Sequence, residues 1–244
     1  MNPKLLIVGL LMAVMTVYDL MTPAAGSFRT PELAKIMFWH TPSAFISTWF
    51  LLHAAYLGLR YFLGRDLKWD VRNGAAIELG ALFGVITMAT GILFSQVQWG
   101  EWWSRDPRQT SFLMVLFLFA LGISLRFGFN DDKKRASVSA AYSLLAVLPA
   151  LFLIFVFPHL PQVERLSLHP SNTIVQDKLD PAYKLGLYGT LTCLALVVGQ
   201  VYSMRVRGGL LALRLEERHG LDKADSGSPT PTGVVRPVGV SEER

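Results

Sequence analysis

Six long apolar runs, separated by short polar segments, are the feature of this sequence that most restricts its fold. Each run is long enough for a hydrocarbon core about 30 Å thick, which takes roughly 20 residues of α-helix to cross. The runs cover residues 5–22, 41–62, 74–97, 110–127, 136–157 and 185–204. Thr41 and Pro42 favour an N-cap followed by proline at the first helical position of the second run. The sequence therefore predicts an all-α integral membrane protein, a bundle of six transmembrane helices without internal repeats.

The composition agrees with this prediction, since 52% of the 244 residues are hydrophobic and only 17% are charged. The net charge of +5 does not indicate a nucleic-acid-binding protein, because the basic residues cluster at the ends of the apolar runs instead of forming one surface. The single cysteine, Cys193, lies inside an apolar run, which excludes a disulfide framework and a cysteine-based metal site.

The positions of Lys and Arg predict which helix ends are cytoplasmic. With both termini inside, 16 of the 23 Lys and Arg residues lie on the cytoplasmic side and 7 on the outer side. Without the three most distant residues of the tail, 13 remain inside and the direction holds. We therefore expect both termini in the cytoplasm, and three segments together on the outer side: residues 26–40, 99–110 and 158–184.

The chain is expected to form one membrane domain over residues 1–204 and a cytoplasmic tail over residues 205–244. The first apolar run is interpreted as a retained helix, although Ala24-Ala25-Gly26 is a weak candidate for signal-peptide cleavage. In the tail, the stretch from Gly209 to Arg218 could extend the sixth helix. The Ser- and Pro-containing sequence after His219 is typical of disorder.

Three of the six tryptophans lie within five residues, between the third and fourth apolar runs. This stretch, called the Trp segment below, extends from Trp99 to Thr110 and reads WGEWWSRDPRQT. Trp favours the membrane–water boundary, and one or two such residues would indicate an ordinary aromatic belt. Three Trp with two Arg and an Asp instead favour a docking surface for a flat, apolar ligand with an anionic edge. A porphyrin fits that description.

Two histidines lie at the edges of the outer segments, His40 just before the predicted second helix and His169 in the last outer segment. A lone histidine in such a position most often has no role. These two, however, share the predicted outer side with the Trp segment, and two neutral imidazoles are what a six-coordinate haem iron needs. Arginines on the same side could pair with the propionates. They are Arg29, Arg105, Arg108 and Arg165.

Other polar residues give weaker signals. His53 lies deeper in the second run than His40, by about 20 Å at 1.5 Å per residue, where a polar group needs a partner. It could ligate a second haem, but a hydrogen bond within the bundle is the favoured interpretation. Glu78, near the inner end of the third run, could likewise be functional or hydrogen-bonded within the bundle. Alternatively, its side chain extends toward the headgroups of the cytoplasmic leaflet. We expect Asp19 to be solvated and His219 to have no role. His159 is a weaker candidate for a ligand than His169.

Four stretches of the chain are similar to a known family. They are Trp39-His40-Thr41-Pro42-Ser43-Ala44, Ile77-Glu78-Leu79-Gly80-Ala81-Leu82-Phe83 with Thr90-Gly91, Trp99-Gly100-x-Trp102-Trp103-x-x-Asp106-Pro107-Arg108-x-Thr110, and Leu168-His169-Pro170. The third is similar to the tryptophan-rich WWD signature of the cytochrome c maturation haem-handling family. By length the chain resembles the haem exporter C members. It departs from the family where Arg105 replaces a usual Trp and Gln109 a common Leu.

The resemblance implies a function and a set of site residues. The family holds haem at the outer membrane surface through two external histidines, which correspond to His40 and His169 as axial ligands of haem b iron. The signature assigns haem contact to Trp99, Trp102, Trp103, Asp106 and Arg108. The implied location is the inner membrane, with these loops on the periplasmic side.

The resemblance also implies partners. The periplasmic haem chaperone CcmE would receive the haem, and the ABC-type subunits CcmA and CcmB with the small membrane subunit CcmD would use ATP to release the loaded chaperone. This chain has no Walker A pattern, so we expect it not to be an enzyme and place any ATP hydrolysis in a partner.

Three alternatives stay open at this point. A membrane b-type cytochrome would carry out electron transfer, but such proteins usually place paired histidines on facing helices within the membrane. An assembly scaffold would use the Trp segment to dock a protein without binding haem. A CcsA- or CcmF-type haem synthetase component would usually have more spans and more histidines.

Overall fold

The computed structural model describes residues 3–26, 29–169 and 179–226, and every regular element in these ranges is helical. The long helices are α1 (Pro3–Met21), α2 (Met37–Gly64), α3 (Leu67–Trp99), α4 (Pro107–Phe127), α5 (Asp132–Leu151) and α7 (Pro181–Ser226). The short elements are η1 (Pro31–Ile36), a π-helical turn η2 (Phe152–Val156), η3 (Phe157–His159) and α6 (Pro161–Glu164).

Within the described residues, four helical stretches are long and apolar enough to cross a membrane: 67–99, 107–127, 132–159 and 181–218. They contain the third to sixth predicted spans and support a membrane protein. The apolar part of α1, Leu5–Met21, is shorter, and α2 has 28 residues whose apolar sequence is interrupted by Ser, Thr and His. The count of six spans and the cytoplasmic termini stay predictions.

Three helices begin earlier than predicted because an aspartate caps each of them. Asp66, Asp106 and Asp131 are the N-caps of α3, α4 and α5, and each side chain accepts a hydrogen bond from a backbone N–H of the first turn. The predicted starts at residues 74, 110 and 136 were therefore wrong by several residues.

The predicted start of the second helix at Thr41 was also wrong, because α2 begins at Met37 and contains Pro42. The preceding η1 runs directly into α2, and the Met37 N–H bonds the carbonyls of Ala34 and Lys35. The first turn thus has partners without a cap at Thr41. His40 consequently lies in the first turn of α2 and not in a loop.

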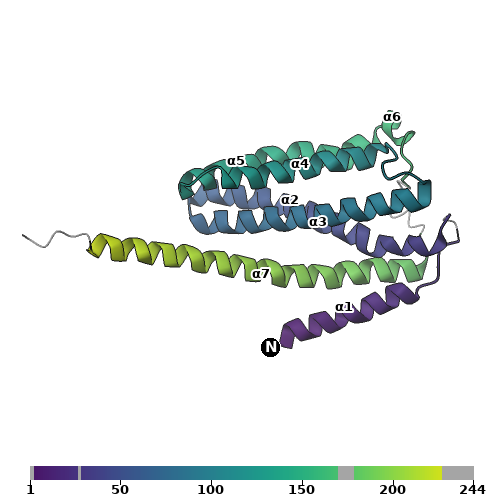
Figure 1. The fold of residues 1–244 in the computed structure, drawn as a ribbon, viewed down its shortest axis with the longest axis horizontal. Helices are drawn as coiled ribbons and strands as arrows, with labels where there is room; N and C mark the ends of the chain where they lie inside the picture. The colour runs from purple at the N-terminus through teal and green to yellow at the C-terminus, as the bar shows by residue number, and fades with distance from the viewer. Residues whose placement is uncertain (1–2, 27–28, 170–178, 227–244) are drawn as a thin grey trace, which may run out of the picture.

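The helix α7 is far longer than the predicted sixth span, since it continues without a break to Ser226. The expected extension over Gly209–Arg218 is confirmed. In Figure 1 this helix projects beyond the bundle at the end opposite the loops that join α1 to α2 and α3 to α4. Disorder was expected directly after His219, and this boundary was wrong because α7 stays helical to Ser226. The remaining part of the tail, residues 227–244, lies outside the described residues.

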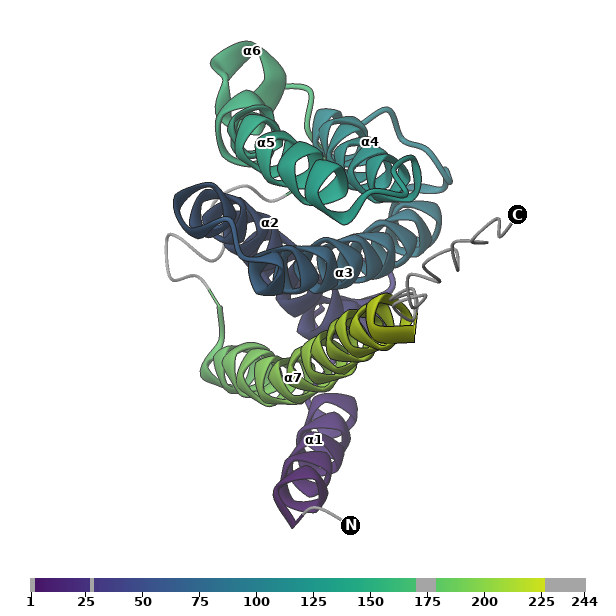
Figure 2. The same cartoon turned by 90° about the vertical axis from the view of Figure 1, so that its left-hand side faces the viewer.

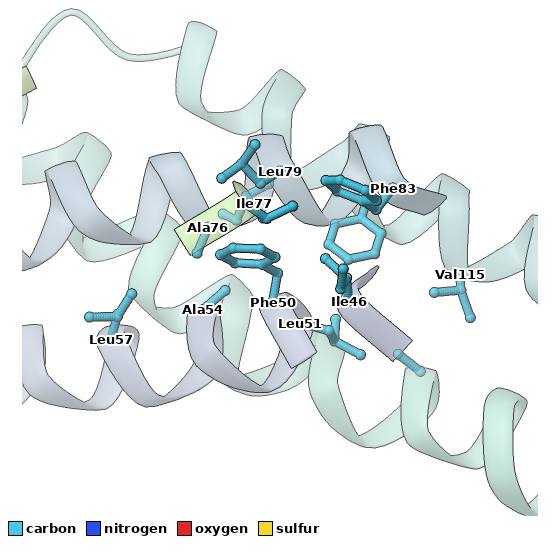
Figure 3. Packing of buried hydrophobic residues seen from close by; sticks show 13 residues of the cluster. Ile46, Phe50, Leu51, Ala54, Leu57, Ala76, Ile77, Leu79, Phe83 and Val115 are labelled. Atoms are coloured by element: carbon cyan, nitrogen blue, oxygen red, sulfur yellow. The ribbon is translucent and has the colours of Figure 1, made fainter. Parts of the chain in front are cut away.

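The helices lie in layers. Figure 2 shows α2 and α3 in the middle, α4 and α5 on one side of them, and α7 followed by α1 on the other. The apolar core lies between these layers, and Figure 3 shows Phe50 and Leu51 of α2 among residues of α3 and α4. Lipid tails are as apolar as Leu, so packing and interhelical hydrogen bonds hold such helices together.

Buried polar side chains supply such bonds. Asn73 of α3 donates to the Ala54 carbonyl at 2.8 Å and to Ser143 Oγ at 3.0 Å, which joins α2, α3 and α5. Asp19 of α1 is 2% exposed and accepts a 2.6 Å bond from Thr190 Oγ1 of α7. The expectation that Asp19 is solvated was wrong, because α7 packs against that face of α1.

At the end of the bundle far from the Trp segment, Asp70 of α3 forms a charged cluster. Its Oδ1 is 2.5 Å from Arg126 Nη1 of α4, and its Oδ2 is 3.3 Å from Arg135 Nε of α5. Arg135 also pairs with Asp132 at 2.7 Å. This cluster fixes the ends of three helices to one another.

Candidate functional site

The three segments expected on one side do come together at one end of the bundle, where α3 ends, α4 begins and α6 lies (Figure 1). Here the connection from α3 to α4, residues 100–106, faces the chain that follows α5. Residues 170–178, which include Pro170 and Lys178, lie outside the described residues.

A cavity of about 170 Å³ opens at this end, and four predicted site residues line it: His40, Trp99, Arg108 and His169. Most of the remaining wall is apolar, with Ala44 of α2, Met88 of α3 and Phe112 of α4. The structure thus brings together one histidine of a helix, one histidine of a loop, an indole and a guanidinium.

The His40 ring is oriented by α3. Its Nδ1 lies 2.9 Å from Thr90 Oγ1, and Thr90 itself donates to the Ile86 carbonyl at 2.8 Å. Since the Thr90 hydrogen is used in this way, its oxygen accepts from the Nδ1–H of His40, which leaves Nε2 with a free lone pair. Gly91 provides the space, because a Cβ there would lie 3.2 Å from His40 Cε1.

The His169 ring is held by a carboxylate and an indole. Its Nδ1 lies 3.6 Å from Asp106 Oδ2, and the Trp99 ring meets it edge to face at a centroid distance of 5.4 Å. A histidine with a carboxylate beside one of its nitrogens is a recurrent arrangement in metal sites.

Asp106 organises the loop that carries His169. The side chain is 1% exposed and accepts hydrogen bonds from the Arg108 N–H at 2.8 Å, the Leu168 N–H at 2.5 Å and Ser167 Oγ at 3.0 Å. Burial alone would raise the pKa of Asp106. The nearby His169 ring and the hydrogen bonds from the Arg108 and Leu168 N–H groups outweigh burial, so the pKa lies well below its usual range.

Arg108 contributes the positive charge of the cavity. Its Nη2 lies 3.4 Å from His159 Nε2, whereas its buried Nε has no hydrogen-bond partner among the described residues. A buried donor without a partner costs free energy, so an acceptor from a ligand would stabilise it. His159 was ranked below His169, and it contacts Arg108 without lining the cavity.

Trp102 and Trp103 lie outside the cavity, with 59% and 36% of their surfaces exposed. The backbone around them turns sharply, with positive φ at Gly100 and Arg105. Gln109 supports the turn by donating from Nε2 to the Trp102 carbonyl at 3.3 Å. The expected single platform is therefore divided, because Trp99 faces the cavity as the last residue of α3 and the other two indoles lie on the surface.

The remaining sequence candidates lie elsewhere. Arg29, Arg105 and Arg165 are exposed and do not line the cavity. His53 Nε2 lies 3.1 Å from the Tyr202 hydroxyl, in agreement with a hydrogen bond within the bundle. Glu78 pairs with Arg205 of α7 at 2.8 Å.

Sequence reasoning missed the partner of His40 and the role of Gln109. Thr90-Gly91 stood out only through the family resemblance, and Gln109 only as a departure from it. The spacing of residues in a sequence predicts which side chains meet within one helix. The bond from His40 to Thr90 depends instead on how α2 packs along α3.

Comparison with known proteins gives consistent matches. A family model described as Heme exporter protein C (CcmC) matches residues 1–219. The Heme exporter protein C of Escherichia coli K12 is 30% identical over 200 residues, covering 80% of this chain and 77% of the relative. That of Paracoccus denitrificans is 29% identical over 205 residues, covering 80% and 83%. A putative cytochrome c biosynthesis ccmC-like mitochondrial protein of Marchantia polymorpha is 30% identical over 113 residues, covering 46% and 49%.

Proposed function

This chain belongs to the heme exporter protein C family, as its sequence resemblance predicted, and on that premise we propose that it binds haem and hands it on during cytochrome c maturation. The observation that carries the proposal is the meeting of His40 and His169 at one apolar cavity that also contains Trp99 and Arg108. The cargo is proposed to be haem b, with the two imidazoles as axial ligands of its iron.

The donor set fits such a cargo. His40 has its Nδ1–H engaged by Thr90, and His169 has Nδ1 beside Asp106, so in this proposal each ring ligates the iron through Nε2. Neutral imidazoles with a fixed second nitrogen are good haem ligands. The buried Nε of Arg108 offers a donor for a propionate, and the apolar wall suits a porphyrin face.

The size of the cavity supports transfer over permanent storage. Pockets that enclose a drug-sized ligand measure about 300–1,000 Å³, whereas this one measures about 170 Å³. The described residues would therefore enclose a porphyrin only in part, and we propose that the rest of its surface is available to a receiving protein. The exposed indoles of Trp102 and Trp103 lie in the same loop as Asp106 and are proposed to contact the ring or the receiver.

The proposed receiver is the haem chaperone CcmE, and the proposed assembly includes CcmA, CcmB and CcmD. We place the protein in the inner membrane, with the cavity on the periplasmic side. No bond-making chemistry is assigned to the chain, so we propose a haem-handling subunit and not an enzyme.

The proposal is tested by the optical spectrum of the purified protein with added haem. His40→Ala and His169→Ala should each remove the low-spin spectrum of a bis-imidazole complex, because each removes one ligand. His159→Ala is the matched control, since it removes an imidazole at the same end that lies outside the cavity. An unchanged spectrum in both single variants, or its loss in the control alone, would end the proposal.

A further inference from the structure

The turn between α2 and α3, at the end of the bundle far from the cavity, carries two arginines that form no ion pair with a carboxylate of the described residues. Arg60 lies with its guanidinium carbon 4.2 Å from the centroid of the Trp69 ring, and Arg72 lies 4.8 Å from the same centroid. Arg60 Nη1 also donates to the Tyr56 hydroxyl at 2.8 Å. Two cations thus pack against one aromatic ring.

No carboxylate near this turn forms an ion pair with Arg60 within the described residues, and Asp66 attracts Arg72 only at longer range. Asp66 is the acidic residue of the turn, and it pairs with Lys68 at 2.6 Å while capping α3. No ion pair to Arg60 or Arg72 occurs within the described part of the chain. Arg65 adds a further exposed cation at the same turn.

The neighbouring turn at this end shows the opposite arrangement. Between α4 and α5, Arg126 and Arg135 both contact Asp70, and Arg135 has Asp132 as well. The same end of the bundle therefore contains one basic cluster with internal counter-ions and one without. Repulsion between Arg60 and Arg72 would be relieved by an anion from outside the chain.

The surroundings indicate which anion. Arg60 lies in the last turns of α2, which ends at Gly64, and Arg72 lies in the first turns of α3, which begins at Leu67. These helix ends are where a membrane-spanning pair is expected to reach the membrane surface. Beside Arg60 on α2, the apolar side chains of Leu59 and Leu63 are 45% and 75% exposed. Arginine binds phosphate through paired hydrogen bonds, and basic residues at the membrane surface attract anionic lipids.

We propose that Arg60, Trp69 and Arg72 form a binding site for the phosphate of an anionic phospholipid headgroup, with the acyl chains along Leu59 and Leu63. In this proposal both guanidinium groups, each packed against the Trp69 indole, donate to one phosphate, and the exposed leucines favour a lipid over a free anion. The site is separate from the haem cavity and does not depend on the proposed haem function.

The test is native mass spectrometry of the purified, delipidated full-length protein with phosphatidylglycerol and with phosphatidylcholine. The wild type should retain phosphatidylglycerol in preference to phosphatidylcholine. Arg60→Gln/Arg72→Gln should weaken phosphatidylglycerol binding roughly tenfold for each arginine, the usual effect of a lost charge-assisted hydrogen bond.

The matched control is Lys133→Gln/Lys134→Gln, which removes the same charge from exposed positions at the same end. We expect the control to change binding less than about threefold, as for other surface charges. Arg60→Lys/Arg72→Lys keeps the charge but not the planar paired donors, so it too should bind more weakly, and it covers the case in which the glutamine variant does not fold.

Three results would overturn the proposal. Equal losses of phosphatidylglycerol binding in Arg60→Gln/Arg72→Gln and in the Lys133→Gln/Lys134→Gln control would indicate an effect of general surface charge. Undiminished binding in Arg60→Lys/Arg72→Lys would exclude a shaped phosphate site. Displacement of phosphatidylglycerol by inorganic phosphate would assign the site to a free anion.

Discussion

Two buried carboxylates at opposite ends of the bundle invite comparison. Asp70 and Asp106 are 2% and 1% exposed, so both are equally removed from solvent. Asp70 is satisfied by two guanidinium groups from two other helices. Asp106 is satisfied by backbone N–H groups, a serine hydroxyl and the nearby imidazole of His169.

The difference separates a structural role from a site role. The charge of Asp70 is matched within the chain, and each partner comes from a long helix, so the cluster can only hold helices together. The charge of Asp106 orders a loop and faces His169, while Arg108 beside it keeps an unpartnered Nε. A buried carboxylate whose neighbours still have unused donors is thus the better marker of a ligand site.

The largest expected effect is that of Asp70→Asn on stability. An amide in this position leaves the partly buried guanidinium of Arg126 without a counter-ion and Arg135 with Asp132 alone, which should lower the free energy of unfolding by about 3–5 kcal/mol. The measurement is unfolding of the purified protein in mixed micelles. Asp132→Asn, which alters only the second partner of Arg135, serves as the control and should cost far less. Equal losses in the two variants would remove the distinction.

The next effect is that of Asp106→Asn on haem binding. An amide keeps the shape but loses the negative charge behind His169, and loss of such an outer partner typically weakens metal binding about 10–100-fold. Haem titration followed by absorbance provides the measurement. Asp131→Asn is matched to it, because Asp131 also caps a helix but lies at the other end. Comparable weakening in Asp131→Asn would mean that helix capping, and not the imidazole contact, is responsible.

The smallest effect is that of Thr90→Val on the same titration. Valine removes a neutral acceptor from His40 Nδ1, and one neutral hydrogen bond is worth about 0.5–1.5 kcal/mol, or roughly two- to twelvefold in affinity. Thr192→Val, which loses only a bond to the Tyr188 carbonyl of its own helix, should leave haem binding unchanged. A larger loss for Thr90→Val than for Asp106→Asn would reverse the comparison.

The sequence predicted the helical class and the residues of the cavity better than the helix boundaries. Thr41-Pro42 and Asp106-Pro107 show the same pattern of cap and proline, yet only the second begins a helix. The first fails because η1 already supplies carbonyl partners upstream. Capping preferences depend only on the residues at the helix start, so they do not reveal whether a helical turn already precedes it.

Long-range packing accounts for the other differences. Asp19 is buried because Thr190 and Gly186 of α7 lie against it, and a Cβ at Gly186 would approach its Oδ1 to 2.7 Å. Trp102 and Trp103 are exposed because the backbone turns at Gly100 and Arg105. Neither the pairing of α1 with α7 nor the path of that turn has a local sequence signal.

The uninterrupted course of α7 has a mechanical consequence. Its 46 residues make a rod about 69 Å long at 1.5 Å per residue, more than twice the hydrocarbon thickness of about 30 Å. Whichever side of the membrane each end faces, a long part of this helix must therefore extend out of the hydrocarbon core. A push or a tilt applied to that projecting portion would be carried along one continuous element to its contact with α1 at Asp19 and Thr190.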